Sequence, residues 1–225
     1  MLICIEGIDG SGKGTVTKKL LETLTQDKED SVSCTMFSFP NYTGTPYGKI
    51  VSRYLNGEFG ESTHPYLHNT LYSIDRFQTK PLLESLLTDN DCVILDRYVP
   101  SNVCYSAIKA KSVEERLEVA MHFLTFEHES LGLPLPDKIF YLDMPTKFAY
   151  ENIAKKKARE YTNLTHDIHE ADFNYLDSVN SFYRYVLPTL YAELDVPVIA
   201  IPCVESDCLR PFECIVSDIV NAIWS

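Results

Sequence analysis

Residues 1–20 read MLICIEGIDGSGKGTVTKKL, and this stretch decides the fold. Residues 2–5 form a short apolar run that is typical of a buried β-strand. A glycine-rich segment at 7–15 follows, and the apolar residues from Val16 to Leu24 then recur on one face of an amphipathic helix. The opening of the chain therefore predicts a strand, a glycine loop and a helix in direct succession.

This succession predicts that the glycine loop binds phosphate. Glycines let the backbone turn tightly, so several N–H groups can face one anion, and the positive end of the following helix adds to the attraction. Lys13 can reach the terminal phosphates of a nucleotide as a point charge. We expect ATP phosphates to be bound by Gly7, Ile8, Asp9, Gly10, Ser11, Gly12, Lys13, Gly14 and Thr15.

One position departs from the usual G-x-x-x-x-G-K-[ST] form of such loops. Gly14 stands where the hydroxyl linked to Mg²⁺ belongs, and Thr15 comes next. A glycine turn that merely caps a helix is the alternative, but the strand, Lys13 and the helix together favour a phosphate site. The segment GSGKGT resembles the corresponding segment of the nucleoside-monophosphate kinases, so the departure from the usual form narrows the choice of family.

The composition limits the classes of protein that need be considered. The chain has 225 residues, of which 45% are hydrophobic, enough for one sizeable domain that we expect to span 1–225. Its formal net charge is −12, from 20 basic and 32 acidic residues. A general nucleic-acid-binding protein needs a basic face, so we expect no nucleic-acid partner.

The cysteines and the N-terminus indicate the compartment. The odd count of seven cysteines, without C-x-x-C spacing, predicts buried reduced thiols rather than disulfides or a zinc site. The N-terminus is already the first predicted strand, with no signal-peptide pattern, and no apolar run approaches ~20 residues. We therefore expect a soluble intracellular protein, cytoplasmic, with no membrane partner.

Short apolar strands alternate with helices along the rest of the chain, which predicts an α/β fold: a parallel five-stranded sheet covered by helices on both faces, in three layers. The other predicted strands are 32–39, 91–96, 139–142 and 196–201, and the loop 40–46 leads to a short helix ending near Asn56. The remaining predicted helices are 63–88, kinked or divided at Pro81, then 100–110, 112–131, one beginning at Pro145, 171–187 and 209–224. Residues 155–170 lack an apolar stripe and are interpreted as a mobile lid, although a solvated loop would have the same composition.

Asp96 ends a buried strand, where ligands bind in open parallel sheets, and Arg97 follows it directly. An aspartate at this point can hold the hydration shell of Mg²⁺, which we expect to bind through phosphates and water near Asp96 and Thr15. The guanidinium of Arg97 is well shaped for a phosphate, although a salt bridge at the end of the strand is the simpler alternative.

Tyr72 and Arg76 are four residues apart on the long predicted helix, so they share a face. An aromatic ring that stacks and an arginine that donates hydrogen bonds can together read a base. A core tyrosine with a surface arginine is the alternative interpretation.

Several separated motifs resemble the thymidylate kinase family: GIDGSGKGT, Phe39-Pro40, YLNGEFG at 54–60, Tyr72 with Arg76, and DRYVPSNVCYSA at 96–107. The resemblance runs from residue 2 to about 175. It implies a phosphate-loop nucleoside-monophosphate kinase fold, ATP and dTMP as substrates, Mg²⁺ as cofactor and a homodimer.

The resemblance also implies roles for individual residues at the acceptor site. Asp9 is expected to face the sugar and phosphate of dTMP, Phe39 to line the pocket and Arg97 to hold the acceptor phosphate. Ser101 and Tyr105 are expected near the base and the deoxyribose, where a bulky ring can exclude a 2′-hydroxyl.

For the base, the resemblance implies that Tyr72, in place of a phenylalanine, stacks on thymine and that Arg76 donates to a base carbonyl. Members of the family often carry a phosphate-clamping arginine beside Phe39-Pro40. The neighbours here are not arginines, and Arg53 is the candidate substitute.

Some members carry a catalytic arginine inside the phosphate loop, at the position of Gly10. The resemblance implies that members with glycine there supply lid cations, and the available set is Arg159 with the lysines at 155–157. The predicted catalytic residues are therefore Lys13, Asp96, Arg97 and Arg159. His166 and His169 could be metal ligands, but no third ligand is spaced to join them.

Two alternatives to a dTMP kinase remain on sequence grounds. One is another small kinase, acting on a different monophosphate or on a deoxynucleoside; the latter would need a carboxylate base beside the acceptor. The other is a nucleotide-binding module without transfer activity, although the N-K-x-D guanine motif of a GTPase switch is absent from the sequence.

Overall fold

The computed structural model describes residues 1–26, 32–59, 65–159 and 172–224, with the side chains of 65 and 156–159 excepted. All five predicted strands are present in one parallel sheet, in the order β2-β3-β1-β4-β5. Their bounds are β1 Leu2–Glu6, β2 Cys34–Ser38, β3 Cys92–Asp96, β4 Lys138–Asp143 and β5 Val198–Pro202.

The central strand β1 has neighbours on both sides, and every one of its residues is buried. Ile5 pairs with Asp96 of β3 on one side and with Phe140 of β4 on the other. Because all five strands are parallel, their carboxyl ends meet at one edge of the sheet. The glycine loop after β1 and the acid at the end of β3 therefore lie next to each other.

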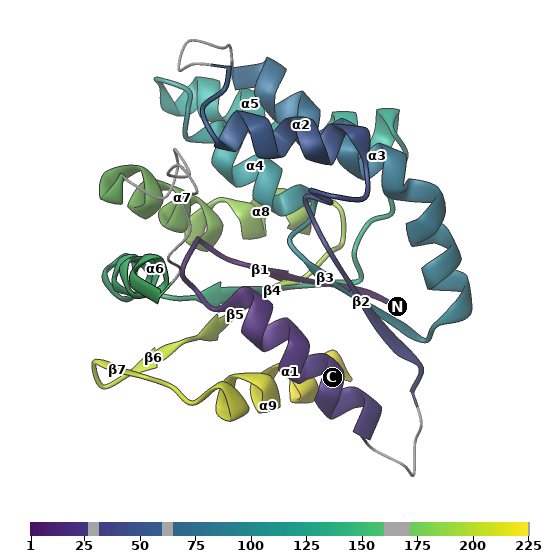
Figure 1. Ribbon diagram of the computed structural model, residues 1–225, viewed down its shortest axis with the longest axis vertical. Coiled ribbons are helices and arrows are strands. Elements are labelled where there is room, and N and C mark those ends of the chain that lie inside the picture. Colours follow the sequence, from purple (N-terminus) through teal and green to yellow (C-terminus); the bar gives the residue numbers. More distant parts are fainter. Residues whose placement is uncertain (27–31, 60–64, 160–171, 225) are drawn as a thin grey trace.

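Helices cover both faces of the sheet, which gives the three predicted layers (Figure 1). One face is covered by α1 (Lys13–Gln26) and α9 (Phe212–Ile223), which pack on each other. The other face is covered by α3 (Pro65–Asp89), α4 (Val99–Ala107), α7 (Phe173–Tyr185) and α8 (Leu187–Ala192), with α2 (Pro46–Leu55) and α5 (Val113–Thr125) outside them. Within the described ranges, no helix is long and apolar enough to cross a membrane.

Three predicted helices differ from the observed ones. The long helix α3 continues through Pro81 and is not divided there. The segment 112–131 is an α-helix only to Thr125 and then widens into the π-helical turn η1 (Phe126–Ser130). The predicted helix 171–187 ends early, because α7 stops at Tyr185 and a separate helix, α8, begins at Leu187 with Pro188 in its first turn.

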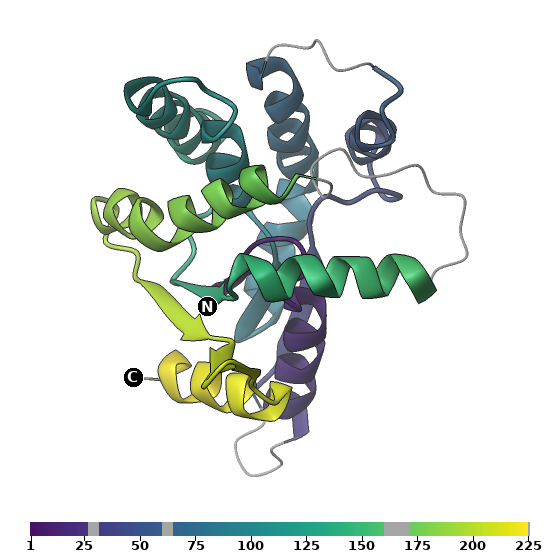
Figure 2. The same ribbon diagram turned by 90° about the vertical axis from the view of Figure 1, so that its left-hand side faces the viewer.

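The end of the chain and the start of the lid also differ from prediction. A short hairpin of β6 (Val204–Glu205) and β7 (Cys208–Leu209) precedes α9, which therefore starts at Phe212 and not at 209. The helix α6 (Thr146–Arg159) includes the first part of the predicted lid, while 160–170 lie outside the described residues. Figure 2 shows α6 crossing in front of the N-terminal end of α1.

Candidate active site

The glycine loop connects β1 to α1 at the carboxyl edge of the sheet. Gly7, Gly10 and Gly12 have φ values of 144°, 80° and 87°, which L side chains rarely adopt. The turn is closed by a bond from the Ser11 amide to the Ile8 carbonyl at 3.2 Å. The remaining loop amides and the start of α1 form the concave, positively polarised surface that binds phosphate in such loops.

Lys13 lies in the first turn of α1, and only 6% of its surface is exposed. Its Nζ donates to the Ile8 carbonyl at 2.7 Å and so folds back over the loop. Burial, together with the positive charge of Arg97, lowers the pKa of Lys13 to about 8 despite the opposing effect of Asp9 and Asp96. The loop therefore contains a buried cation whose natural partner is a bound anion.

Gly10 lies directly beneath α6. A Cβ added to it would be 2.2 Å from the Ala149 carbonyl oxygen, and the Gly10 carbonyl accepts a hydrogen bond from Asn152 at 3.0 Å. This packing leaves no room for any side chain at position 10. The loop arginine that some thymidylate kinases carry is thus sterically excluded here.

Gly14 and Asp96 lie in contact across the same edge. A Cβ on Gly14 would be 3.3 Å from Oδ2 of Asp96, so the glycine lets the carboxylate approach the start of α1. Asp96 is half-buried and its carboxylate accepts no bond from the described residues, while Thr15 is exposed. No group of three metal-ligating side chains is found in the described ranges. A lone oxygen ligand beside a phosphate loop fits Mg²⁺ held mainly by phosphates and water.

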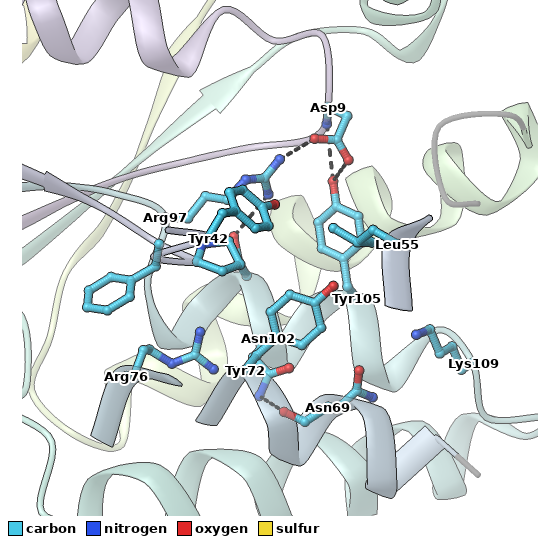
Figure 3. Close-up of a pocket in the computed structure, with 13 residues that line it drawn as sticks. Asp9, Tyr42, Leu55, Asn69, Tyr72, Arg76, Arg97, Asn102, Tyr105 and Lys109 are labelled. Atoms are coloured by element: carbon cyan, nitrogen blue, oxygen red, sulfur yellow. Dashed lines mark hydrogen bonds and ion pairs between the residues drawn. The ribbon is translucent and has the colours of Figure 1, made fainter. Parts of the chain in front are cut away.

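A cavity of about 190 Å³ opens beside the loop, and all seven residues predicted to bind dTMP line it (Figure 3). They are Asp9, Phe39, Tyr72, Arg76, Arg97, Ser101 and Tyr105. The wall also includes residues that sequence reasoning did not select: Pro40, Tyr42, Leu55, Asn69, Asn102 and Lys109. Asp9 belongs to both the loop and the cavity, so the two predicted sites are adjacent.

Charged and hydroxyl groups are concentrated at the loop end of this cavity. Arg97 forms an ion pair with Asp9, and its Nη1 donates to Ser101 Oγ at 3.2 Å. The hydroxyl of Tyr105 donates to Asp9 at 2.9 Å, and burial, with the negative charge of Asp9, raises its pKa well above the ordinary value. Arg97 has a φ of 67°, which directs its guanidinium back toward the loop.

The buried carboxylate of Glu6 supports this end from below. It accepts bonds from the Tyr98 amide at 2.7 Å, from Ser101 Oγ at 2.7 Å and from the Tyr183 hydroxyl at 2.8 Å. Burial raises the pKa of Glu6, and these hydrogen bonds oppose the shift. Glu6 therefore fixes Ser101, which in turn contacts Arg97.

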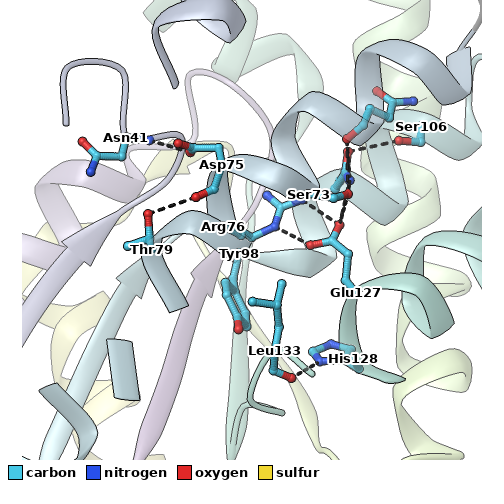
Figure 4. Close-up of polar contacts among 12 residues, drawn as sticks. Asn41, Ser73, Asp75, Arg76, Thr79, Tyr98, Ser106, Glu127, His128 and Leu133 are labelled. Carbon is cyan, nitrogen blue, oxygen red and sulfur yellow. Dashed lines mark hydrogen bonds and ion pairs between the residues drawn. The ribbon is translucent and has the colours of Figure 1, made fainter. Parts of the chain in front are cut away.

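Arg76 is buried at the other end of the cavity, so the alternative of a surface arginine is wrong. Glu127 in η1 pairs with it through Nε at 2.5 Å and through Nη2 at 2.7 Å (Figure 4). Nothing in the sequence marked Glu127, because a π-helical turn has no sequence signature that separates it from the end of an ordinary helix.

The loop after β2 is fixed to α3 at this same end. The carboxylate of Asp75, fully buried, accepts bonds from the Asn41 amide at 2.8 Å and from the Thr45 hydroxyl. Arg53, the candidate clamp, instead pairs with Glu58 at 2.7 Å and is not among the residues lining the cavity. Tyr42, which is exposed, does line the cavity together with Arg97 (Figure 3).

The lid residues are only partly described. Arg159 ends α6, but its side chain and those of the lysines at 156 and 157 lie outside the described part, as do His166 and His169. Lys155 is exposed and lies 3.9 Å from Glu151 on its own helix. All seven cysteines are free. Cys4, Cys92, Cys104 and Cys203 are buried as predicted, whereas Cys34 is half-buried and Cys208 and Cys214 are exposed.

Comparisons with known proteins agree with the resemblance. A family model described as thymidylate kinase matches residues 5–188. The chain is 32% identical over 173 residues to the thymidylate kinase of Mycobacterium tuberculosis. The aligned residues make up 76% of this chain and 78% of that protein. It is also 32% identical over 155 residues to that of Caenorhabditis elegans, covering 66% and 65%.

The fold is similar to that of a solved thymidylate kinase from Candida albicans. The TM-score is 0.69, with 99% of this chain and 90% of that chain covered. At 21% sequence identity this likeness shows the fold alone.

Proposed function

The chain belongs to the thymidylate kinase family, and we propose that it transfers the γ-phosphate of ATP to dTMP, giving dTDP and ADP. The observation that carries this proposal is the shared position of Asp9. It stands in the phosphate loop and also lines the cavity that contains all seven predicted acceptor residues. A donor bound on the loop and an acceptor bound in the cavity would thus present their phosphates to each other.

The donor side rests on the loop amides and Lys13. A polyphosphate bound over the loop would replace the Ile8 carbonyl as the partner of the Lys13 ammonium, because two oppositely charged groups attract more strongly than a cation and a neutral oxygen. The phosphate charge would also raise the lowered pKa of Lys13. Lys13 would then stay protonated while charge develops on the transferring phosphoryl group.

The acceptor phosphate is proposed to bind Arg97. Its guanidinium is held by Asp9 and Ser101, so little side-chain freedom is lost when a phosphate binds. Tyr42 is the proposed replacement for the clamp expected beside Phe39, since it lines the same cavity as Arg97, whereas Arg53 pairs with Glu58 and does not line it.

The base is proposed to bind between Tyr72 and the loop after β2, with Arg76 at its edge. Tyr105 narrows the cavity next to Asp9, where the sugar would lie, and its ring would exclude a 2′-hydroxyl. This arrangement favours a deoxynucleotide.

Mg²⁺ is proposed as the cofactor, with Asp96 as the residue that would hold its hydration shell, at the side of α1 where Gly14 leaves room. When bound, it would supply neutralisation of charge on the phosphate oxygens. Thr15, which is exposed, follows Gly14 in the first turn of the same helix.

The reaction is proposed to be an in-line attack of a dTMP phosphate oxygen on the γ-phosphorus of ATP. The acceptor phosphate is already ionised at neutral pH, so no residue has to remove a proton. The chain's contribution is orientation and charge, from Lys13, Arg97 and a lid cation. We assign the lid cation to Arg159, since Gly10 cannot be replaced by an arginine where it packs under α6.

A deoxynucleoside kinase is the nearest rival function. It would need a carboxylate free to take a proton from a hydroxyl. Asp9 is the acid in the cavity, and it is engaged by both Arg97 and Tyr105. This observation favours an acceptor that is already charged.

Two further properties of the family are proposed here. We propose a homodimer formed through α3, where Leu67, Phe77 and Leu82 are exposed apolar side chains. We also propose a cytoplasmic location. Sedimentation of the purified protein at several concentrations tests the first proposal.

A coupled ADP-release assay tests the function. The protein is incubated with ATP and Mg²⁺ and with dTMP, dUMP, thymidine or AMP in turn, and a reaction without acceptor gives the background. We expect ADP release to be fastest with dTMP and to be lost in Lys13→Ala. Faster release with thymidine would favour the nucleoside kinase, and ATP binding without any release would indicate a module without transfer activity.

A further inference from the structure

A buried carboxylate lies behind the wall of the acceptor cavity. Glu127, in the π-helical turn η1, has no exposed surface. Besides its two bonds from Arg76, it accepts one from Asn102 Nδ2 at 2.7 Å and one from Ser73 Oγ at 3.0 Å (Figure 4). Arg76 and Asn102 both line the cavity, so Glu127 contacts two residues of the site without reaching the site itself.

These bonds fix which atoms of Arg76 can meet a ligand. Glu127 occupies Nε and Nη2, and among the described residues Nη1 has no partner. Every nitrogen of a guanidinium is a donor and none is an acceptor. Figure 3 shows the guanidinium turned toward the cavity, where it can only donate.

The same carboxylate fixes the orientation of Asn102. The amide nitrogen donates to Glu127, to the Asn69 carbonyl at 3.1 Å and to Ser73 Oγ at 3.1 Å. The amide oxygen accepts one bond, from Ser106 at 3.3 Å, so one of its two lone pairs is left for a ligand. At this residue the cavity wall therefore offers an acceptor.

The cavity wall thus places a donor beside an acceptor. The edge of thymine offers the complement, a carbonyl at position 4 and an N–H at position 3. A cytosine ring offers an amine at position 4 and a bare nitrogen at position 3, which opposes both groups. A site whose polar groups would be left unpaired rejects such an analogue strongly.

We propose that Glu127 is a positioning residue that sets this order of donor and acceptor and thereby selects 4-oxo over 4-amino pyrimidine monophosphates. The inference rests on the proposed function, because it concerns how that acceptor site distinguishes bases. The carboxylate is suited to this role because it only accepts. It accepts from two donors of Arg76 and from the amide nitrogen of Asn102 at once, and neither side chain can turn round without losing a bond.

Glu127→Gln tests the proposal. The substitution keeps the shape of the side chain but replaces one accepting oxygen with an N–H₂ group, which would oppose either Arg76 or Asn102. The measurement is kcat/KM for dTMP and for 5-methyl-dCMP, which differ only at positions 3 and 4 of the ring. We expect the ratio between them to fall at least tenfold, through a raised KM for dTMP, with the KM for ATP little changed.

Glu6→Gln is the matched control, because Glu6 is also a glutamate that has no exposed surface and accepts several hydrogen bonds. It supports Ser101 and Arg97 at the phosphate end, so we expect it to lower activity on both monophosphates and to leave their ratio unchanged. A thermal unfolding curve for each variant shows that the proteins are folded. If Glu127→Gln does not fold, Glu127→Asp takes its place. We expect a smaller fall in the kcat/KM ratio for this variant, because the carboxylate is kept but lies farther from Arg76 and Asn102.

An unchanged ratio in the folded Glu127 variant overturns the proposal, as does an equal change of the ratio in Glu6→Gln. Both results would mean that Glu127 serves only the fold. A wild-type protein that releases no ADP with dTMP would instead refute the proposed function. The role of Glu127 can then still be tested by calorimetry, which measures the affinities of wild type and of Glu127→Gln for the two nucleotides.

Discussion

Replacing Lys13 with methionine should abolish turnover and at the same time stabilise the protein that has no nucleotide bound. Burial lowers the pKa of Lys13 from 10.5 to about 8. One pKa unit corresponds to about 1.4 kcal/mol, so keeping the proton on this buried lysine costs the folded state roughly 3 kcal/mol. Methionine has a similar length and carries no charge.

Part of this gain will be offset. Lys13 donates to the Ile8 carbonyl at 2.7 Å, and losing such a bond costs about 1 kcal/mol. We therefore expect the free energy of unfolding of Lys13→Met to exceed that of wild type by about 1–3 kcal/mol at neutral pH.

The pH dependence of stability independently checks the sign of this difference in the free energy of unfolding. Below about pH 8 the lysine is protonated in both states, so the cost is fully present. Between about 8 and 10.5 the unfolded state holds more protons than the folded state, so the stability of wild type rises with pH. The advantage of Lys13→Met should therefore shrink across this interval.

Urea unfolding of both proteins without nucleotide, between pH 7 and 10.5, measures these differences. Lys19→Met on the same helix is the control, since the hydrogen bond and charge of Glu213 raise the pKa of Lys19. Stability from that pair is fully present below the unfolded pKa of 10.5 and is lost only above it, so the difference between Lys19→Met and wild type should stay constant across this interval. A Lys13→Met protein that is less stable than wild type, or whose difference does not vary with pH, would refute the reasoning.

Three further changes test other parts of the site. Asp75→Asn should raise the KM for dTMP and lower the free energy of unfolding by about 1–3 kcal/mol, because the loop after β2 loses its charged acceptor; steady-state kinetics and urea unfolding measure both, and an unchanged KM would argue against the loop's role. Gly10→Ala should destabilise the protein by several degrees in Tm and depress turnover, since its Cβ would meet the Ala149 carbonyl at 2.2 Å; a normal Tm would show that α6 can move aside. Arg159→Ala should lower kcat much more than it changes either KM, and Lys156→Ala is its control. Normal kcat in Arg159→Ala with a strongly lowered kcat in Lys156→Ala would show that Arg159 does not supply the lid charge.

The sequence predicted the sheet well because most of its strands are continuous apolar runs; β2, which includes Thr35 and Ser38, is the exception. It predicted the helix ends less well. The break at Val186 and the hairpin before Phe212 depend on packing against the rest of the fold, which no local pattern reports. Pro81 leaves α3 undivided, so the helical state of that segment is maintained by tertiary contacts.

The residues that line the cavity were predicted from the sequence, but the residues that hold those side chains in position were not. Tyr72, Arg76 and Arg97 lie in motifs with a chemical rationale, and all three line the cavity. Glu127 lies far from Arg76 in the sequence, and only the folded chain joins them. Arg53 was chosen as the nearest cation along the chain, yet its short-range partner Glu58 holds it on the surface.

The tight fit of Gly10 beneath α6 also restricts how this enzyme could change over generations. A single substitution to arginine at position 10 meets the helix backbone before it can add a charge to the loop. The helix would have to shift first, and that shift would also loosen the bond from Asn152. A lineage that starts here would therefore have to find any positive charge beyond that of Lys13 outside the loop, and grafting a loop arginine into this scaffold would require redesigning α6 as well.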